Sequence, residues 1–169
     1  TQPNRMEDVA GQVERYGQMA GTETTANAVA SAFRKRLEGL RKANENKAKI
    51  RVFYQIWKSP LMTVGGPQII SDAIKLCGGE NVFGQLKQMA PTVSVEAVLE
   101  TDPEVIVATG MGDAKPEWLG DWDKWTRMTA VKRNNLYHIN PDIMQRHTPR
   151  ILDGAEKLCA HLDTARSRR

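Results

Sequence analysis

Apolar residues recur at helical spacing along the first 45 residues of the chain. This pattern predicts a first helix over residues 5–19 and a longer one from Glu23 to Asn44, followed by a turn. The longer helix has one apolar face, because its hydrophobic residues are three or four positions apart. These residues are Ala26, Val29, Phe33, Leu37 and Leu40. We therefore expect two amphipathic helices before the first strand.

From residue 48 onward, runs of β-branched and aromatic residues alternate with helical stretches. Strands are predicted at 50–56, 81–83, 104–108 and 136–139. Helices are predicted at 69–76, 94–99 and 116–125, and a last one opens at Thr148-Pro149. This alternation favours a mainly parallel sheet with helices on both faces, so the predicted fold class is α/β with three layers, α/β/α. The chain then divides into a helical segment, 1–47, and an α/β lobe, 48–169.

Charge and composition exclude some classes of partner. The net charge of +4 is spread evenly, with 8 basic and 6 acidic residues in 1–48 and 16 and 14 in 49–169. A nucleic-acid-binding protein usually carries a basic face or stripe, so no nucleic-acid partner is predicted. No apolar stretch approaches the ~20 residues that span a bilayer. The chain begins with Thr1 instead of Met, so we expect a processed product, with any targeting segment upstream.

Motifs for catalysis and metal binding are absent from the sequence. It contains no GxSxG, Walker A, HExxH or GxGxxG pattern. The three histidines, His138, His147 and His161, are scattered, and only His147 falls in a loop at a strand end. A metal-centred or enzymatic α/β domain would need several such residues there. We therefore predict no catalytic residues, no metal site and no cofactor.

Two cysteines, Cys77 and Cys159, each lie late in a predicted helix on its apolar face. Two cysteines without a CxxC pattern do not make a zinc site, which usually takes four ligands. The residues alone leave two possibilities open, a pair of buried thiols or one disulfide.

Loops that follow the strands are the candidate binding region, because ligands of open α/β sheets bind outside the carboxyl ends of the strands. Three loops qualify: 57–65, 110–115 and 140–147. The first offers Trp57 and Met62, which suit a large apolar or planar ligand. The third offers Asp142 and Arg146 as polar groups. The alternatives are that Trp57 covers the core at the sheet end and that Asp142 and Arg146 form a surface ion pair.

Four motifs in this order and spacing resemble the C-terminal half of cobalamin-binding periplasmic proteins. They are CGGENVF at 77–83, PTVSVEAVL at 91–99, DPEVIV at 102–107 and RHTPR at 146–150. That family belongs to the helical-backbone (class III) substrate-binding proteins of ABC importers, with haem and ferric-siderophore binders. The resemblance covers the whole chain. It implies that the opening helices include a long interlobe helix, that 48–169 is the C-terminal lobe, and that an N-terminal lobe lies upstream.

The function implied by the resemblance is binding and not catalysis. The protein would capture cobalamin in the periplasm, free or lipid-anchored, and deliver it to the membrane permease. Cobalamin would be the transported ligand and not a cofactor. A haem or ferric-siderophore binder of the same fold is the alternative. Haem would usually require a His or Tyr axial ligand, and a siderophore would require several arginines at the cleft.

The resemblance also assigns roles to individual residues. The implied ligand-binding residues are Ile56, Trp57, Met62, Ala90, Asp142 and Arg146. Asp142 and Arg146 match polar cleft residues of the family, whereas Ile56, Met62 and Ala90 stand at positions that are aromatic in the best-known cobalamin binder.

Three further residues have implied roles outside the cleft. Glu96 matches an acidic residue that docks onto an arginine of the permease, although a Glu at a helix N-terminus is also favoured by the helix dipole. Cys77 and Cys159 match a disulfide-bonded pair. Without the other lobe, the exposed apolar face predicts self-association of this chain.

Overall fold

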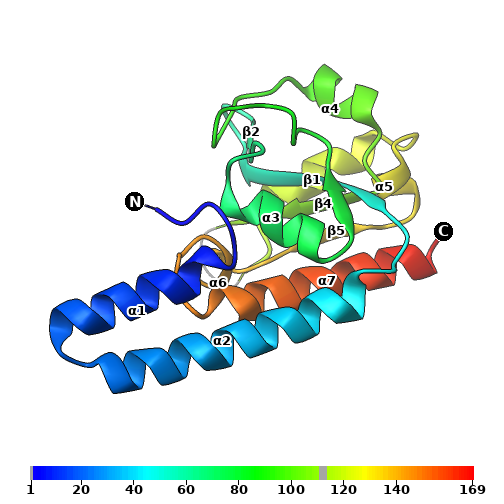
Figure 1. The fold of residues 1–169 in the computed structure, drawn as a ribbon. Helices are drawn as coiled ribbons and strands as arrows, with labels where there is room; N and C mark the ends of the chain where they lie inside the picture. Colours follow the sequence, from blue (N-terminus) through cyan, green and yellow to red (C-terminus); the bar gives the residue numbers. More distant parts are fainter. Residues whose placement is uncertain (1, 111–113) are drawn as a thin grey trace.

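The computed structural model describes residues 2–110 and 114–169, and it opens with a hairpin of two helices. α1 (Asp8–Ala20) and α2 (Glu23–Asn44) lie side by side and extend past the edge of the sheet (Figure 1). Gly21 ends α1 with φ 69°, in the left-handed region that glycine adopts without strain. Gly17 lets the helices approach, since a Cβ there would lie 2.2 Å from that of Ala26.

A mainly parallel sheet follows, as predicted. Its strands are β1 (Ile50–Trp57), β2 (Met62–Thr63), β3 (Gly79–Asn81), β4 (Val105–Ala108) and β5 (Leu136–His138). The order is β2-β1-β4-β5, and β3 runs beside the first half of β1. β3 and β4 are parallel to β1, and β5 is parallel to β4, whereas the short β2 is antiparallel to the end of β1.

Helices cover both faces, which confirms the three-layer α/β/α architecture (Figure 1). The hairpin, α3 (Ile69–Leu76), α6 (Pro141–Met144) and α7 (Ile151–Ser167) cover one face. α4 (Val95–Thr101), the 3-10 helix η1 (Glu117–Lys124) and α5 (Thr129–Lys132) cover the other. Alternation along β1 divides the core accordingly, because Val52 and Tyr54 pack on the first face and Phe53 on the second.

Several boundaries differ from the sequence prediction. The first helix begins at Asp8 and not at residue 5, because the Met6 N–H donates to the Asp72 carboxylate (2.7 Å) and holds the preceding segment against α3. The strand predicted at 81–83 lies at 79–81, where it pairs with Ile50–Val52 of β1. The last helix begins at Ile151, after the predicted Thr148-Pro149 opening. A short helix, α6, replaces the turn predicted at Asn140-Pro141. Residues 111–113 of the second predicted loop lie outside the described residues.

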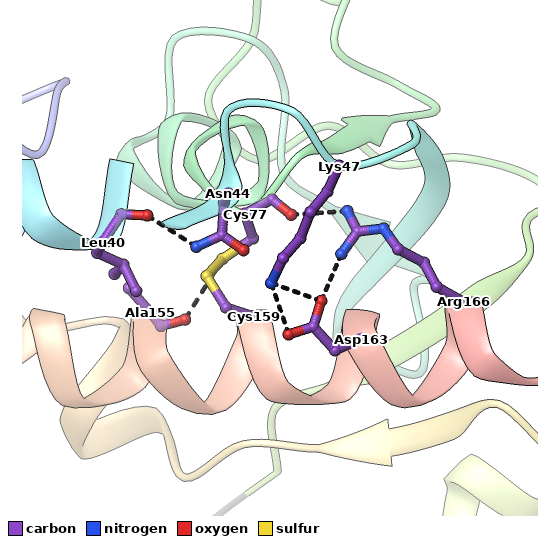
Figure 2. Close-up of a disulfide and its surroundings, with 8 residues drawn as sticks. All are labelled: Leu40, Asn44, Lys47, Cys77, Ala155, Cys159, Asp163 and Arg166. Atoms are coloured by element: carbon purple, nitrogen blue, oxygen red, sulfur yellow. Dashed lines mark hydrogen bonds and ion pairs between the residues drawn. A yellow bond between two sulfur atoms is a disulfide. The ribbon is translucent and has the colours of Figure 1, made fainter. Parts of the chain in front are cut away.

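A disulfide between Cys77 and Cys159 joins the end of α3 to α7, so the pairing that the resemblance implied is confirmed (Figure 2). Polar contacts surround it. The Lys47 ammonium and the Arg166 guanidinium both reach the Asp163 carboxylate, at 2.8 and 2.7 Å, and Arg166 also donates to the Cys77 carbonyl (2.8 Å). The disulfide and these contacts join three parts of the chain: α3, α7 and the segment that follows α2.

Apolar side chains remain exposed on the helical hairpin. Met19 is 82% exposed, and Tyr16 and Val29 are also open to solvent. Self-association of this chain stays a prediction.

In the described part of the chain, no helix has the length and apolar character required to cross a membrane.

Candidate ligand-binding site

The carboxyl ends of β1, β4 and β5 meet at one edge of the sheet, and a cavity of about 720 Å³ lies there. Three chain segments line it: the end of β1, the residues from the end of β4 to the start of η1 (Glu117 and Trp118), and α6 with the residues after it. The described lining residues are Ile56, Trp57, Thr109, Gly110, Ala114, Lys115, Pro116, Glu117, Trp118, Pro141, Asp142, Gln145 and Arg146.

One wall of the cavity is polar and comes from α6 and the residues that follow it. Asn140 caps this helix, because its side-chain oxygen accepts a hydrogen bond from the Asp142 N–H (2.8 Å). One turn later, the Arg146 guanidinium lies 2.9 Å from the Asp142 carboxylate. The surface ion pair considered from the sequence therefore forms, and it lies on the cavity wall. Both side chains are more than half exposed, so the pair adds little to stability and stays accessible to a ligand.

A second wall is apolar and begins at the end of β1. Ile56 is half-buried there, and Trp57 is 49% exposed instead of covering the core. The Trp57 indole N–H donates to the Ser59 carbonyl (3.0 Å), which fixes one edge of the ring. An exposed indole held at one edge can offer its face to a planar ligand.

At the sheet end beneath the cavity, Thr109 and Tyr54 are buried residues with uncharged polar groups. The Gln145 amide donates to the Thr109 hydroxyl (2.9 Å) and so ties the polar wall to the end of β4. The Tyr54 hydroxyl is fully buried and has no hydrogen bond of good geometry. Burial raises the pKa of Tyr54 strongly, against a smaller lowering effect of the Thr109 hydroxyl, so the phenol stays neutral.

Four of the six predicted ligand-binding residues, Ile56, Trp57, Asp142 and Arg146, lie together on this cavity. Met62 and Ala90 do not line it. Met62 lies in β2, paired with Trp57, and forms an isolated bridge to Thr92, while Ala90 is exposed in the segment before that bridge.

Glu96 lies outside the cavity, on the exposed side of α4. The Ser94 hydroxyl caps this helix by accepting a hydrogen bond from the Ala97 N–H (3.1 Å). The Glu96 side chain is exposed to solvent and is not among the described lining residues of the cavity.

Lys115 and Gln145 lie in the predicted loops 110–115 and 140–147 but were not singled out, and the sequence prediction missed Thr109 and Trp118. A signal existed for Gln145, because the spacing i, i+3, i+4 puts Asp142, Gln145 and Arg146 on one side of a helical turn. Trp118 gave no comparable signal, since its position depends on how η1 packs onto the sheet.

A second hollow of about 650 Å³ lies between the N-terminal segment, α3 and β3, and the carboxyl ends of β1, β4 and β5 do not line it. Three of its polar side chains, those of Ser71, Asp72 and Asn81, already have hydrogen-bond partners within the protein. The Asn81 amide donates to the Val64 carbonyl (2.8 Å) and the Ser71 hydroxyl (2.6 Å), and Asp72 holds the Met6 N–H. No aromatic residue is among those that line it. The strand-end cavity is therefore the candidate site.

Across residues 2–110 and 114–169, no cluster of three or more His, Cys, Asp or Glu could hold a metal ion.

Comparison with known sequences places relatives along nearly the whole chain. A profile of the periplasmic binding protein family matches residues 1–143. The vitamin B12-binding protein of Vibrio parahaemolyticus serotype O3:K6 is 31% identical over 167 residues, covering 97% of this chain and 59% of that protein. The corresponding protein of Yersinia pestis is 28% identical and covers 95% of this chain and 55% of its own length. The chain thus spans less than two thirds of the length of these relatives.

Solved structures share the fold. The periplasmic vitamin B12 binding protein BtuF of Vibrio cholerae superposes with a TM-score of 0.87 at 29% identity, covering 98% of this chain and 64% of that one. The periplasmic heme-binding protein RhuT from Roseiflexus has a TM-score of 0.83 at 15% identity, with 97% and 65% covered. An Fe3+-hydroxamate transport protein from Saccharomonospora viridis has 0.82 at 20%, with 96% and 57% covered. The last two likenesses show the fold alone.

Proposed function

Because the chain belongs to the periplasmic binding protein family, we propose that it is part of the substrate-binding component of an ABC importer, which captures cobalamin in the periplasm and delivers it to the permease. The observation that carries the proposal is the strand-end cavity, with an apolar wall at Trp57 and an ionic wall at Asp142 and Arg146. The vitamin B12-binding relatives support the same ligand. Cobalamin is then cargo, held without a chemical step.

Cobalamin matches both walls of the cavity. Its corrin ring is broad and largely apolar on its faces, so it can bury surface against the Trp57 indole and Ile56. Its edge carries amide groups. The Asp142 carboxylate can accept a hydrogen bond from an amide N–H, and the Arg146 guanidinium can donate to an amide oxygen. The ligand would thus replace the exposed ion pair by bonds of its own, which fix its orientation.

Haem or a ferric siderophore is the alternative ligand, because proteins that bind such compounds share the fold. Haem iron is commonly held by a His or Tyr, and no described lining residue of the cavity is of either type. The cations on the described lining are Lys115 and Arg146, accompanied by the acids Glu117 and Asp142. This balanced charge favours a ligand with neutral polar groups over an anionic chelate.

We propose further that Glu96 docks onto an arginine of the permease. The carboxylate is exposed on α4 and does not line the cavity. Glu100 lies one turn further along the same helix and is also exposed, so it is a matched control. Glu96→Ala is expected to slow uptake into permease vesicles with ligand affinity unchanged, whereas Glu100→Ala leaves uptake normal. Equal uptake by both variants contradicts this docking role.

Calorimetric titration tests the identity of the ligand. The protein, prepared at the length of its relatives, is titrated with cyanocobalamin, with haemin and with a ferric hydroxamate. Saturable binding of cyanocobalamin, at least 100-fold tighter than the other two, is the expected result. Tighter binding of haemin or the hydroxamate would replace the ligand while keeping the transport role. Binding of none of the three would overturn the proposal.

A further inference from the structure

The 3-10 helix η1 brings a second tryptophan, Trp118, to the cavity from a part of the chain remote from Trp57. We propose that Trp118 contacts the ligand and, with Trp57, forms a two-indole wall that selects for large planar or macrocyclic ligands. This inference rests on the proposed function only in assuming that the strand-end cavity is the binding site.

The start of η1 is held close to the end of β4. Pro116 precedes the helix, and a Cβ on Gly110 would lie 3.1 to 3.2 Å from its ring atoms. Such a contact is tighter than most real Cβ contacts, so a side chain at position 110 would require Pro116 to shift by a few tenths of an ångström. The backbone that presents Trp118 is therefore packed directly against the sheet end.

The middle of η1 is anchored in the core by Leu119 and Trp122, which are both buried. The Trp122 indole N–H donates to the Gln55 side-chain oxygen (2.8 Å), and the ring meets Phe53 edge-on, with centroids 5.7 Å apart. Lys58, in the β1–β2 turn, also pairs with the Asp121 carboxylate (3.2 Å), although both side chains are more than half exposed and the pair adds little. A side chain on so firmly held a helix has a defined position before the ligand arrives, which lowers the entropic cost of binding.

Trp118 itself is only half-buried, although its neighbours in η1 fill the core. It borders the 720 Å³ cavity and also a smaller hollow of about 220 Å³, which Leu61 and Val95 line as well. Trp118 is therefore a lining residue of both spaces. Of the described lining residues of the cavity, Trp57 and Trp118 are the aromatic ones, so they supply its flat apolar surfaces.

The test compares variants of the full-length protein by calorimetry. Trp118→Ala is expected to weaken cyanocobalamin binding by about 10-fold or more, as loss of one buried aromatic contact predicts. Trp118→Phe keeps a flat ring and is expected to restore binding to within about threefold. Trp125→Ala is the matched control, because Trp125 directly follows η1 and does not line the cavity.

A second readout separates contact from folding. Ligand-induced quenching of tryptophan fluorescence should fall in Trp118→Phe while the urea midpoint stays as in the parent protein. Unchanged affinity in Trp118→Ala, with a loss in Trp57→Ala, would overturn the two-indole wall. If haemin binds and cyanocobalamin does not, the proposed ligand changes from cobalamin to haem. The same variants then test the two-indole wall with haemin. Binding of none of the three ligands by the parent protein would overturn both proposals.

Discussion

The indole nitrogen of Trp122 lies 2.8 Å from the side-chain oxygen of Gln55, to which it donates a hydrogen bond between two buried side chains. The Gln55 amide in turn donates to the carbonyl of Trp57 (3.3 Å). These bonds connect η1 with the end of β1, the two segments that carry the apolar wall of the cavity. The wall is therefore fixed by the core beneath it and not by its own exposed residues.

Trp122→Phe is expected to lower the free energy of unfolding by about 1–3 kcal/mol. The variant keeps the aromatic contact with Phe53 but leaves the buried Gln55 oxygen without its donor. Urea denaturation measures the change, and Trp125→Phe, at a partly exposed position, should change it by less than about 0.5 kcal/mol. Equal stability of the two variants would show that the bond contributes nothing.

The free energy of unfolding of the double variant Cys77→Ala, Cys159→Ala is expected to be about 4 kcal/mol lower than that of the parent protein. The disulfide closes a segment of 82 residues, and its loss raises the entropy of the unfolded chain. Lys47, Asp163 and Arg166 still hold the same region, so the native circular dichroism spectrum should not change. The measurement is urea denaturation of oxidised and variant protein. A loss of less than about 1 kcal/mol would mean that these polar contacts, and not the disulfide, secure α7.

Glu104 lies just before β4, at the end of the strand opposite the cavity, and three arginines surround its carboxylate. Arg169 lies 3.1 Å from it, and Arg51 and Arg133 lie 3.6 and 3.7 Å away. Burial by itself would raise the pKa of Glu104. The N–H of Arg51 and the guanidinium of Arg169 outweigh burial, so the pKa lies below its ordinary value of 4.5.

This lowered pKa predicts an acid-sensitive contribution to stability. Folding favours the charged carboxylate, so the contribution is complete above about pH 4.5 and is lost as the pH falls through the folded-state pKa. Glu104→Gln should therefore be less stable than the parent protein at pH 6, and the difference should shrink below pH 4. Denaturation curves from pH 3 to 7 measure it. A difference that is constant across this range would exclude the charge as its cause.

Asp142→Ala and Arg146→Ala are expected to separate binding from stability. The exposed pair should add less than about 1 kcal/mol to folding. In the full-length protein, either variant should weaken cyanocobalamin binding by about 10-fold or more, because a hydrogen bond from a charged group is lost. Thermal unfolding and calorimetry provide the two readouts. Unchanged affinity in both variants would remove the polar wall from the site.

The sequence predicted most elements because local pattern decides them. The apolar spacing of Glu23–Asn44 and Ile69–Leu76 matches α2 and α3 to the residue. The rule that ligands bind outside the carboxyl ends of parallel strands was enough to predict that Trp57, Asp142 and Arg146 lie at one edge of the sheet.

Features that depend on tertiary packing could not be predicted in this way. Met62 is drawn into β2 by pairing with the end of β1, so it does not join the lining of the cavity. Trp118 reaches the cavity because Trp122 anchors η1 through Gln55, a contact 67 positions apart in the sequence. The pattern of apolar and polar residues around Met62 or Trp118 does not predict whether either residue lines the cavity.

Hydrogen exchange of the full-length protein with and without saturating cyanocobalamin tests the location of the site most directly. Slower exchange is expected around Trp57, at 114–118 and at 141–146, the segments that line the strand-end cavity. Exchange near Ser71 and at 79–85, around the second hollow, should not change. Protection of the second hollow, with the strand-end segments unaffected, would contradict the assignment of the ligand to the carboxyl ends of the strands.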